Sequence, residues 1–151
     1  MPTREETTAE QEPMGFFKHI SNSSQTDECL RLLDRRGYDG YGRWWRLCEH
    51  LSVIKGHRIK FETDEDVRII ARTLDFGKSG AFDEYMAIED CKSFVSDLLD
   101  IKLLERDSDG FLISPMILEN ARYIARQRVN GRKGGRPRKN TKNNDSAGQD
   151  V

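Results

Sequence analysis

Basic side chains collect near the end of this chain in a pattern that can bind phosphate groups. Nine basic residues and no acidic ones lie between Ala121 and Lys142, whereas residues 1–120 carry a net charge of -8 and the whole chain -1. A basic arm on an acidic body is typical of proteins that contact nucleic acid. Glycines in the stretch NGRKGGRPRKN, residues 130–140, let the backbone approach a DNA groove closely. The sequence therefore predicts DNA binding through this arm.

The candidate DNA-binding residues belong to the arm and to one helix of the body. They are Arg126, Arg128, Arg132, Lys133, Arg136, Arg138 and Lys139 in the arm, with Arg68 and Arg72 spaced four apart on a predicted helix. The Arg136–Arg138 segment is similar to half of an AT-hook, with Gly134 where that motif has its first arginine. Two other interpretations of the arm are a solvating tail and a basic targeting signal.

Further cations are scattered over the predicted body. They are Arg43, Arg46, Lys55, Arg58 and Lys60, with His57 among them. If they converge, they form a second phosphate-binding surface. The interpretation that we favour slightly is a set of surface ion pairs with the many carboxylates.

Nothing in the residue pattern indicates catalysis. The three histidines are scattered, and no Ser/His/Asp set, phosphate loop or paired carboxylates stand out, so we expect no enzyme activity and no cofactor. Cys29, Cys48 and Cys91 are odd in number and widely spaced, which favours buried free thiols over a metal site. Trp44 and Trp45 could stack on bases, but an apolar helical stripe favours a place in the core.

Apolar spacing and capping residues predict five helices, a short strand and a hairpin. The expected elements are a helix over 26–36 ended by Gly37, a helix from about 40 to 54, a strand at 57–61, a helix opened by Thr63 and ending near Gly77, a helix over 83–100, a hairpin of 103–106 with 111–114, and a helix from Pro115 that ends near 130. This order predicts a mainly α fold with a small β-hairpin, specifically a winged helix-turn-helix.

The composition predicts one domain between two tails. Residues 1–13 and 130–151 lack the apolar side chains needed to offset the entropy of ordering, so we expect both to be disordered around a domain at 14–129. No signal peptide or long apolar run is present, so the expected location is the cytoplasm of a bacterial host.

The helix predicted over 83–100 is unsuited to enter a DNA groove. It holds six carboxylates and a single lysine, Lys92, so phosphates would repel it. A protein-facing or solvated role is expected for this helix.

Several of these features together resemble a known family. The run Gly37–Gly42 followed by Trp45, the capped helix after Phe61, the hairpin and the basic stretch from Gly131 to Lys139 are similar to the N-terminal domain of phage replisome-organiser proteins. That domain is related in fold to the N-terminal winged helix of the primosome protein DnaD. The resemblance implies a DNA-binding replication-initiation accessory protein of a phage or mobile element, with a replication helicase or its loader, or another host protein, as partner. Nothing after Lys139 matches the second, helical domain of the longer members, which leaves DNA binding better supported than helicase recruitment.

Two other functions fit the same residues. A winged-helix transcriptional repressor would bind palindromic duplex sites as a symmetric dimer. A protein-interaction module would use the acidic helix to bind a host replication or defence protein, and its activity would survive removal of the tail. A homodimer, and a preference for single or double strands, stay open at this point.

Overall fold

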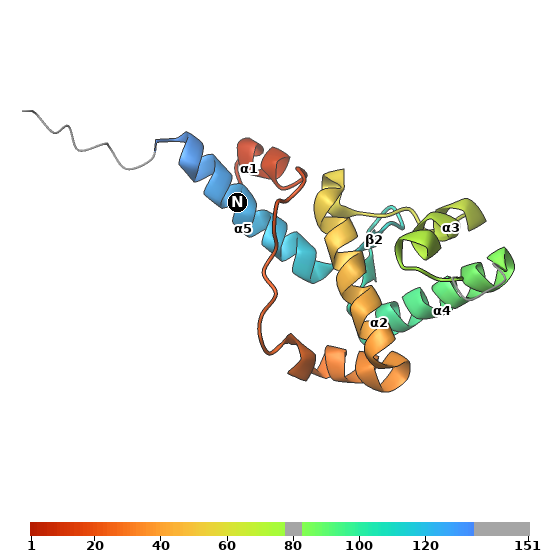
Figure 1. Cartoon of the computed structure of the whole chain (residues 1–151). Coiled ribbons are helices and arrows are strands. Elements are labelled where there is room, and N and C mark those ends of the chain that lie inside the picture. The colour runs from red at the N-terminus through yellow and green to blue at the C-terminus, as the bar shows by residue number, and fades with distance from the viewer. Residues whose placement is uncertain (78–82, 135–151) are drawn as a thin grey trace, which may run out of the picture.

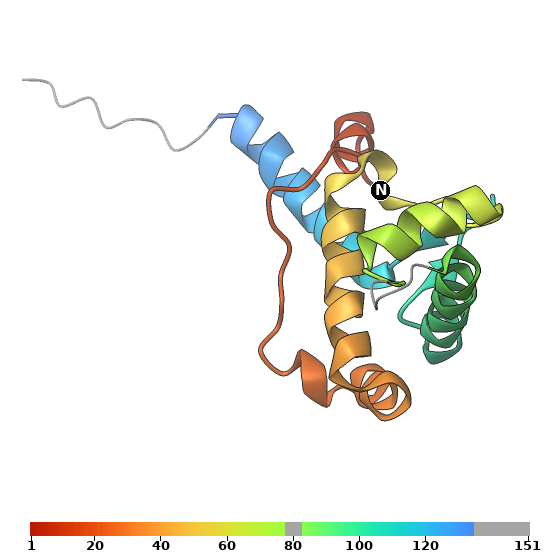
Figure 2. The same ribbon diagram turned by 45° about the vertical axis from the view of Figure 1, so that its right-hand side comes forward.

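The computed structural model describes residues 1–77 and 83–134. Its helices are α1 (Arg4–Ala9), α2 (Asp27–Val53), α3 (Asp64–Thr73), α4 (Glu84–Ile101) and α5 (Pro115–Arg132), its 3-10 turns are η1 (Ser23–Gln25) and η2 (Lys55–His57), and its strands are β1 (Glu105–Arg106) and β2 (Leu112–Ile113). Helix α2 lies in the middle, with α3 and α4 on one side and α5 on the other (Figures 1 and 2). The predicted mainly α fold with a small antiparallel hairpin is confirmed.

The predicted capping residues begin their helices as expected. Thr63 Oγ1 accepts the Asp66 N–H, and the Asp66 carboxylate accepts the Thr63 N–H, both at 3.1 Å, which completes a capping box at α3. Asp83 caps α4, and Ser114 Oγ accepts the Ile117 N–H at the start of α5, where Pro115 takes the first position.

Gly37 divides α2 into the two helices that the sequence predicts. Its φ of 64° and ψ of -165° lie in a region that only glycine enters at low cost, and they turn the chain between the two arms of α2. The turn lets the long arm pack its buried side chains against the rest of the core while the short arm runs along α4.

The Gly37→Ala variant is expected to lose about 1–3 kcal/mol of unfolding free energy, because a Cβ strains this backbone conformation. Gly42→Ala is the matched control, since Gly42 is helical, exposed and has open space around it. Alanine there should raise stability by up to about 1 kcal/mol. Urea unfolding followed by circular dichroism checks both, and equal effects at the two sites would contradict the role of Gly37.

The core forms where α2, α3, α4 and α5 meet. Trp44, Leu47 and Leu51 of α2 belong to one core cluster with Phe94 and Leu98 of α4, and all five side chains are buried. Trp45 is half-buried, so the core interpretation of the two tryptophans holds.

All three cysteines are buried free thiols, as predicted. Burial raises the pKa of the Cys91 thiol to about 12 and raises that of Cys48 as well. These thiols therefore pack as small apolar side chains in the folded protein.

The hairpin pairs Glu105 with Ile113 and Arg106 with Leu112, around a turn in which Gly110 has a φ of 84°. The strand predicted at 57–61 is reduced to one bridge, in which Ile59 and Leu112 exchange backbone hydrogen bonds of 3.0 and 2.8 Å. His57 does not extend this strand because it ends η2 with a φ of 52°, outside the strand region, and its buried ring places Nδ1 2.8 Å from the Leu51 carbonyl oxygen.

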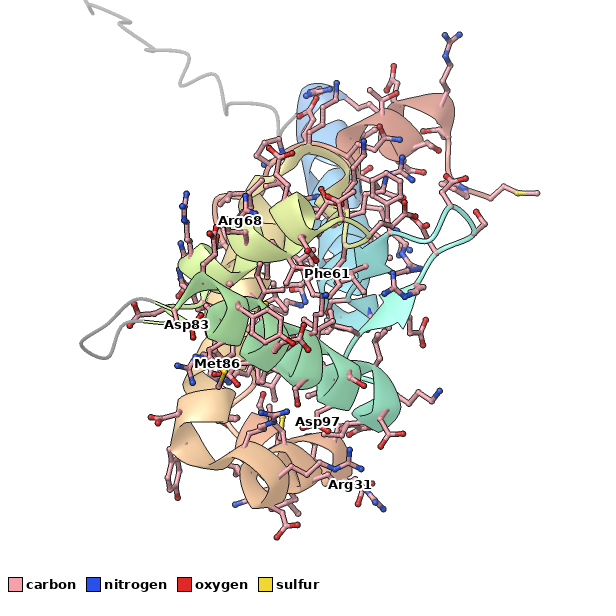
Figure 3. The ribbon with its side chains drawn as sticks, turned by 90° about the vertical axis from the view of Figure 1, so that its right-hand side faces the viewer. Arg31, Phe61, Arg68, Asp83, Met86 and Asp97 are labelled. Carbon is pink, nitrogen blue, oxygen red and sulfur yellow. The ribbon has the colours of Figure 1, made fainter. Side chains whose placement is uncertain are left out.

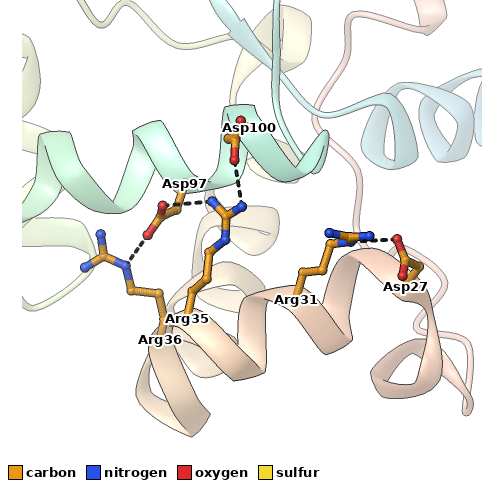
Figure 4. A network of polar contacts seen from close by, with 6 residues as sticks. All are labelled: Asp27, Arg31, Arg35, Arg36, Asp97 and Asp100. Carbon is orange, nitrogen blue, oxygen red and sulfur yellow. Dashed lines mark hydrogen bonds and ion pairs between the residues drawn. The ribbon is translucent and has the colours of Figure 1, made fainter.

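A polar network joins the short arm of α2 to α4 (Figure 4). Arg36 Nε donates to Asp97 at 2.6 Å, while Arg35 donates to Asp97 at 3.1 Å and to Asp100 at 2.7 Å. Burial alone raises the pKa of Asp97, but the hydrogen bonds from Arg36 and Arg35 outweigh it and hold that pKa below its ordinary value. The ionised carboxylate thus contributes to the stability of the fold.

The unfolding free energy of the Asp97→Asn variant should therefore be lower than that of the wild type by on the order of 1–2 kcal/mol at neutral pH. Because the folded pKa is depressed, the contribution of Asp97 is complete above its unfolded pKa of about 3.9 and disappears as the pH falls through the folded value. Urea unfolding at about pH 7 and pH 3 should show the gap between wild type and variant shrinking at the lower pH. A gap that stays constant would contradict this account.

The N-terminal segment differs from the expected disordered tail. Thr3 caps α1 in a box with Glu6, and Ala9 is buried against Ala125 and Val129 of α5 in a small cluster apart from the main core. Arg128 secures the same segment by donating to the Pro13 carbonyl oxygen at 2.9 Å. These contacts join residues far apart in the chain, so the composition of residues 1–13 alone does not show them.

Candidate nucleic-acid interface

Helix α5 has one buried face and one charged face. Ile117, Ala121, Ile124 and Ala125 are buried, as the apolar spacing predicts, and they fix the rotation of the helix on the body. The helix continues through Gly131 to Arg132, beyond its predicted end near 130, and Lys133 caps it. The basic sequence therefore begins on an ordered helix.

The exposed face carries a row of cations. Arg122, Arg126 and Lys133 are exposed and follow one another at helical spacing, while Arg132 occupies the last turn. Residues 115–134 contain five basic side chains and one carboxylate, Glu119. Cations near the C-terminal end of a helix interact favourably with the helix dipole, so the positive charges there do not destabilise α5. The arrangement can hold consecutive phosphates along one line.

Arg128, one of the predicted DNA-binding residues, has a structural role in this arrangement. Its guanidinium bonds the Pro13 carbonyl oxygen and lies 3.6 Å from the Glu12 carboxylate. These contacts direct it to the N-terminal segment and away from the exposed row. Arg122 takes its place in the row, and the spacing of four residues to Arg126 is the sequence signal that identifies it.

Arg68 and Arg72 lie on α3, on the other side of α2 from α5 (Figures 1 and 2). Arg68 forms an ion pair with Glu84 of α4, close to the start of that helix (Figure 3), whereas Arg72 is exposed. The structure therefore does not bring this pair together with the arm. Arg136, Arg138 and Lys139, the remaining predicted residues, lie outside the described residues.

The other scattered cations do not converge on one surface. Arg58 donates to Asp107 and Asp109, both at 3.2 Å, across the hairpin turn, and it stacks on Phe111. Arg43 donates to the Leu74 carbonyl oxygen at 2.9 Å, and Arg46 pairs with Glu49. The ion-pair interpretation of these residues is correct for Arg46 and Arg58. Little uncompensated positive charge is left on the hairpin.

The segment before α2 adds aromatic groups beside α5, which sequence reasoning missed. Phe17 and His19 lie parallel to the Trp45 ring, with centroids 6.2 and 3.6 Å away, and Lys18 places its ammonium 3.7 Å from the centre of the Tyr123 ring. The Lys18 N–H also donates to the Asn120 side-chain oxygen at 2.9 Å. This segment therefore lies along α5 next to the cation row.

Other kinds of site find no support in the part of the chain that the structure describes. Within residues 1–77 and 83–134, no His, Cys, Asp and Glu side chains gather in a group of three that could hold a metal ion. Among the helices of the same residues, none has the length and apolar character to cross a membrane.

The chain matches no protein-family model, no curated protein and no solved structure. The function proposed below is therefore based on the chemistry of the α5 surface.

Proposed function

We propose that this protein binds DNA through the cation row of α5 and the basic sequence that follows it, as an accessory protein in replication initiation of the phage replisome-organiser type. The observation that carries the proposal is the row Arg122, Arg126 and Lys133, exposed on a helix that leads directly into further arginines and lysines. On a body that is acidic elsewhere, this row defines one surface for a polyanion.

The order of elements supports a winged helix-turn-helix body. Two helices, α3 and α4, pack against each other after the bridge residue Ile59, and the hairpin that follows returns β2 to pair with Ile59. The single bridge at Ile59 lies where a winged helix-turn-helix would have its third strand, and it supports this part of the proposal.

The electrostatics of α4 favour α5 as the DNA-contacting helix. In a helix-turn-helix of this order α4 would enter the major groove, yet its outer face carries Glu89 and Asp90 beside Tyr85 and Met86. Its other carboxylates already pair with arginines of α2 and α3. Phosphates approaching this face would meet negative charge, so sequence-independent contact through α5 is the better use of the scaffold.

A protein-interaction role is the second candidate, and α4 favours it. Tyr85 and Met86 expose more than half of their side-chain surface at the start of α4, next to acidic side chains (Figure 3). A replication helicase, its loader or another host protein is the partner class that we propose for this face, with a homodimer as a further hypothesis. Light scattering of the Tyr85→Ser and Met86→Ser variants tests the homodimer, which would dissociate if this face holds it.

The test of DNA binding is a salt titration of the full chain and of a shortened chain that ends at Gly134. Shortening keeps α5 and removes Arg136, Arg138, Lys139 and Lys142. If all four contact phosphates, the log-log salt slope on duplex DNA should flatten by about 3 to 4, since each contact contributes about 0.9. Absence of binding by the full chain at about 50 mM salt would refute the proposed function.

A further inference from the structure

A groove of about 380 Å³ lies between the segment that precedes α2 and the exposed side of α5. The segment is fixed on α5 by the bond from the Lys18 N–H to Asn120, and Asn120 in turn donates to the Met116 carbonyl oxygen at 2.9 Å. Met116, Ile20 and Tyr123 provide apolar walls, and Asn22 and Ser23 provide polar edges. A flat ligand with apolar faces and polar edges fits such walls.

Two large apolar side chains that line this groove are exposed, and a third exposed one, Phe16, comes four residues before Ile20 in the sequence. Phe16 is 66% exposed, Ile20 62% and Tyr123 43%. Alternation along the segment explains the pattern, because Phe17 and His19 turn toward Trp45 while Phe16, Lys18 and Ile20 turn away from it. Single exposed apolar residues need no explanation, but Ile20 and Tyr123 line the same groove and together mark a binding surface.

The charges beside these side chains select the ligand. Arg122 is adjacent to Tyr123 in the sequence and Arg126 lies one turn further along, so both cations flank the ring on the surface of α5. The Lys18 ammonium is a third cation, and it covers one face of the Tyr123 ring at 3.7 Å from the ring centre, so a base stacks on the opposite face. The groove also holds Glu119, which repels phosphates but can accept a hydrogen bond from the amino group of a base.

We propose that this groove binds unpaired bases of single-stranded DNA, with a base stacked at Tyr123 and the neighbouring phosphates on Arg122 and Arg126. The inference rests on the proposed function and adds the strand form of the DNA. In a duplex the faces of the bases are covered by their neighbours, so exposed aromatic rings gain nothing there, whereas a single strand offers base faces and phosphates together.

The experiment measures fluorescence anisotropy of a labelled single-stranded oligothymidine and of a labelled duplex with the full chain. Tyr123→Ala should weaken single-strand binding by about fivefold to 150-fold, and Ile20→Ala, which removes an apolar wall of the groove, should weaken it in the same direction. Both variants should leave duplex binding within about twofold. Tyr123→Phe keeps the ring and should retain the affinity. Tyr38→Ala is the matched control, because Tyr38 is 84% exposed beside the kink of α2, away from the groove.

Three results would overturn the inference. Unchanged single-strand binding by both alanine variants, with circular dichroism showing them folded, would remove the groove from DNA binding while leaving the proposed function in place. Equal losses of affinity for the duplex and for the single strand would show that the groove side chains do not give a preference for single-stranded DNA. Absence of binding to either probe by the unmodified chain would refute the inference and the proposed function together.

Discussion

Replacing Arg122, Arg126 and Lys133 of α5 with glutamine should reduce duplex DNA affinity on the order of 100-fold at about 0.1 M salt, and should flatten the log-log salt slope by about 2.7. The three side chains are exposed and follow one another at helical spacing, so each can release a counterion on contact with a phosphate. Glutamine preserves helix propensity and is an unbranched, uncharged polar side chain, so loss of charge is the main change. Anisotropy titrations across salt concentration measure both quantities.

A second triple variant provides the control for total charge. Lys55, Lys60 and Lys102 are also exposed and lie off α5, so their replacement with glutamine removes the same net charge from other surfaces. Long-range attraction alone is screened within about 10 Å at 0.1 M salt, so this control should keep most of its affinity. Equal losses in the two variants would contradict α5 as the contact surface.

Replacing Trp44 with alanine should lower the unfolding free energy by about 3–5 kcal/mol. Its side chain is 1% exposed and is one of the largest in the core cluster that includes Leu47, Leu51 and Phe94, so the removed ring would leave a cavity. The free energy of unfolding of a small domain is only about 5–15 kcal/mol in total, so the variant should be close to unfolding at physiological temperature. Urea unfolding followed by circular dichroism measures the change.

Tyr38→Ala is the control for this substitution, because it also removes an aromatic ring, but one that is exposed to solvent. Its stability should stay within about 0.5 kcal/mol of wild type. A loss of less than about 1 kcal/mol for Trp44→Ala would contradict the central place of the indole in the core.

Local chemistry in the sequence determined most of the helices and the hairpin. Thr63 with Asp66, and Ser114 with Pro115, satisfy backbone groups within three residues of themselves, so the same short sequences cap helices in any fold that exposes them. Gly37 and the Asp109-Gly110 turn act over similarly short distances. Helical spacing also placed Trp44 and Ile117 in the core before any tertiary contact was known.

The contacts around the candidate site could be decided only by the tertiary structure. The residues that pair there are far apart in the chain: Arg128 with Pro13, Lys18 with Asn120, and Arg68 with Glu84. Pairs at such separation depend on how the helices pack, which neither residue type nor local spacing encodes. For this reason the sequence shows the run of positive charge, whereas only packing decided that Arg122 and Arg126 face solvent while Arg128 contacts the N-terminal segment.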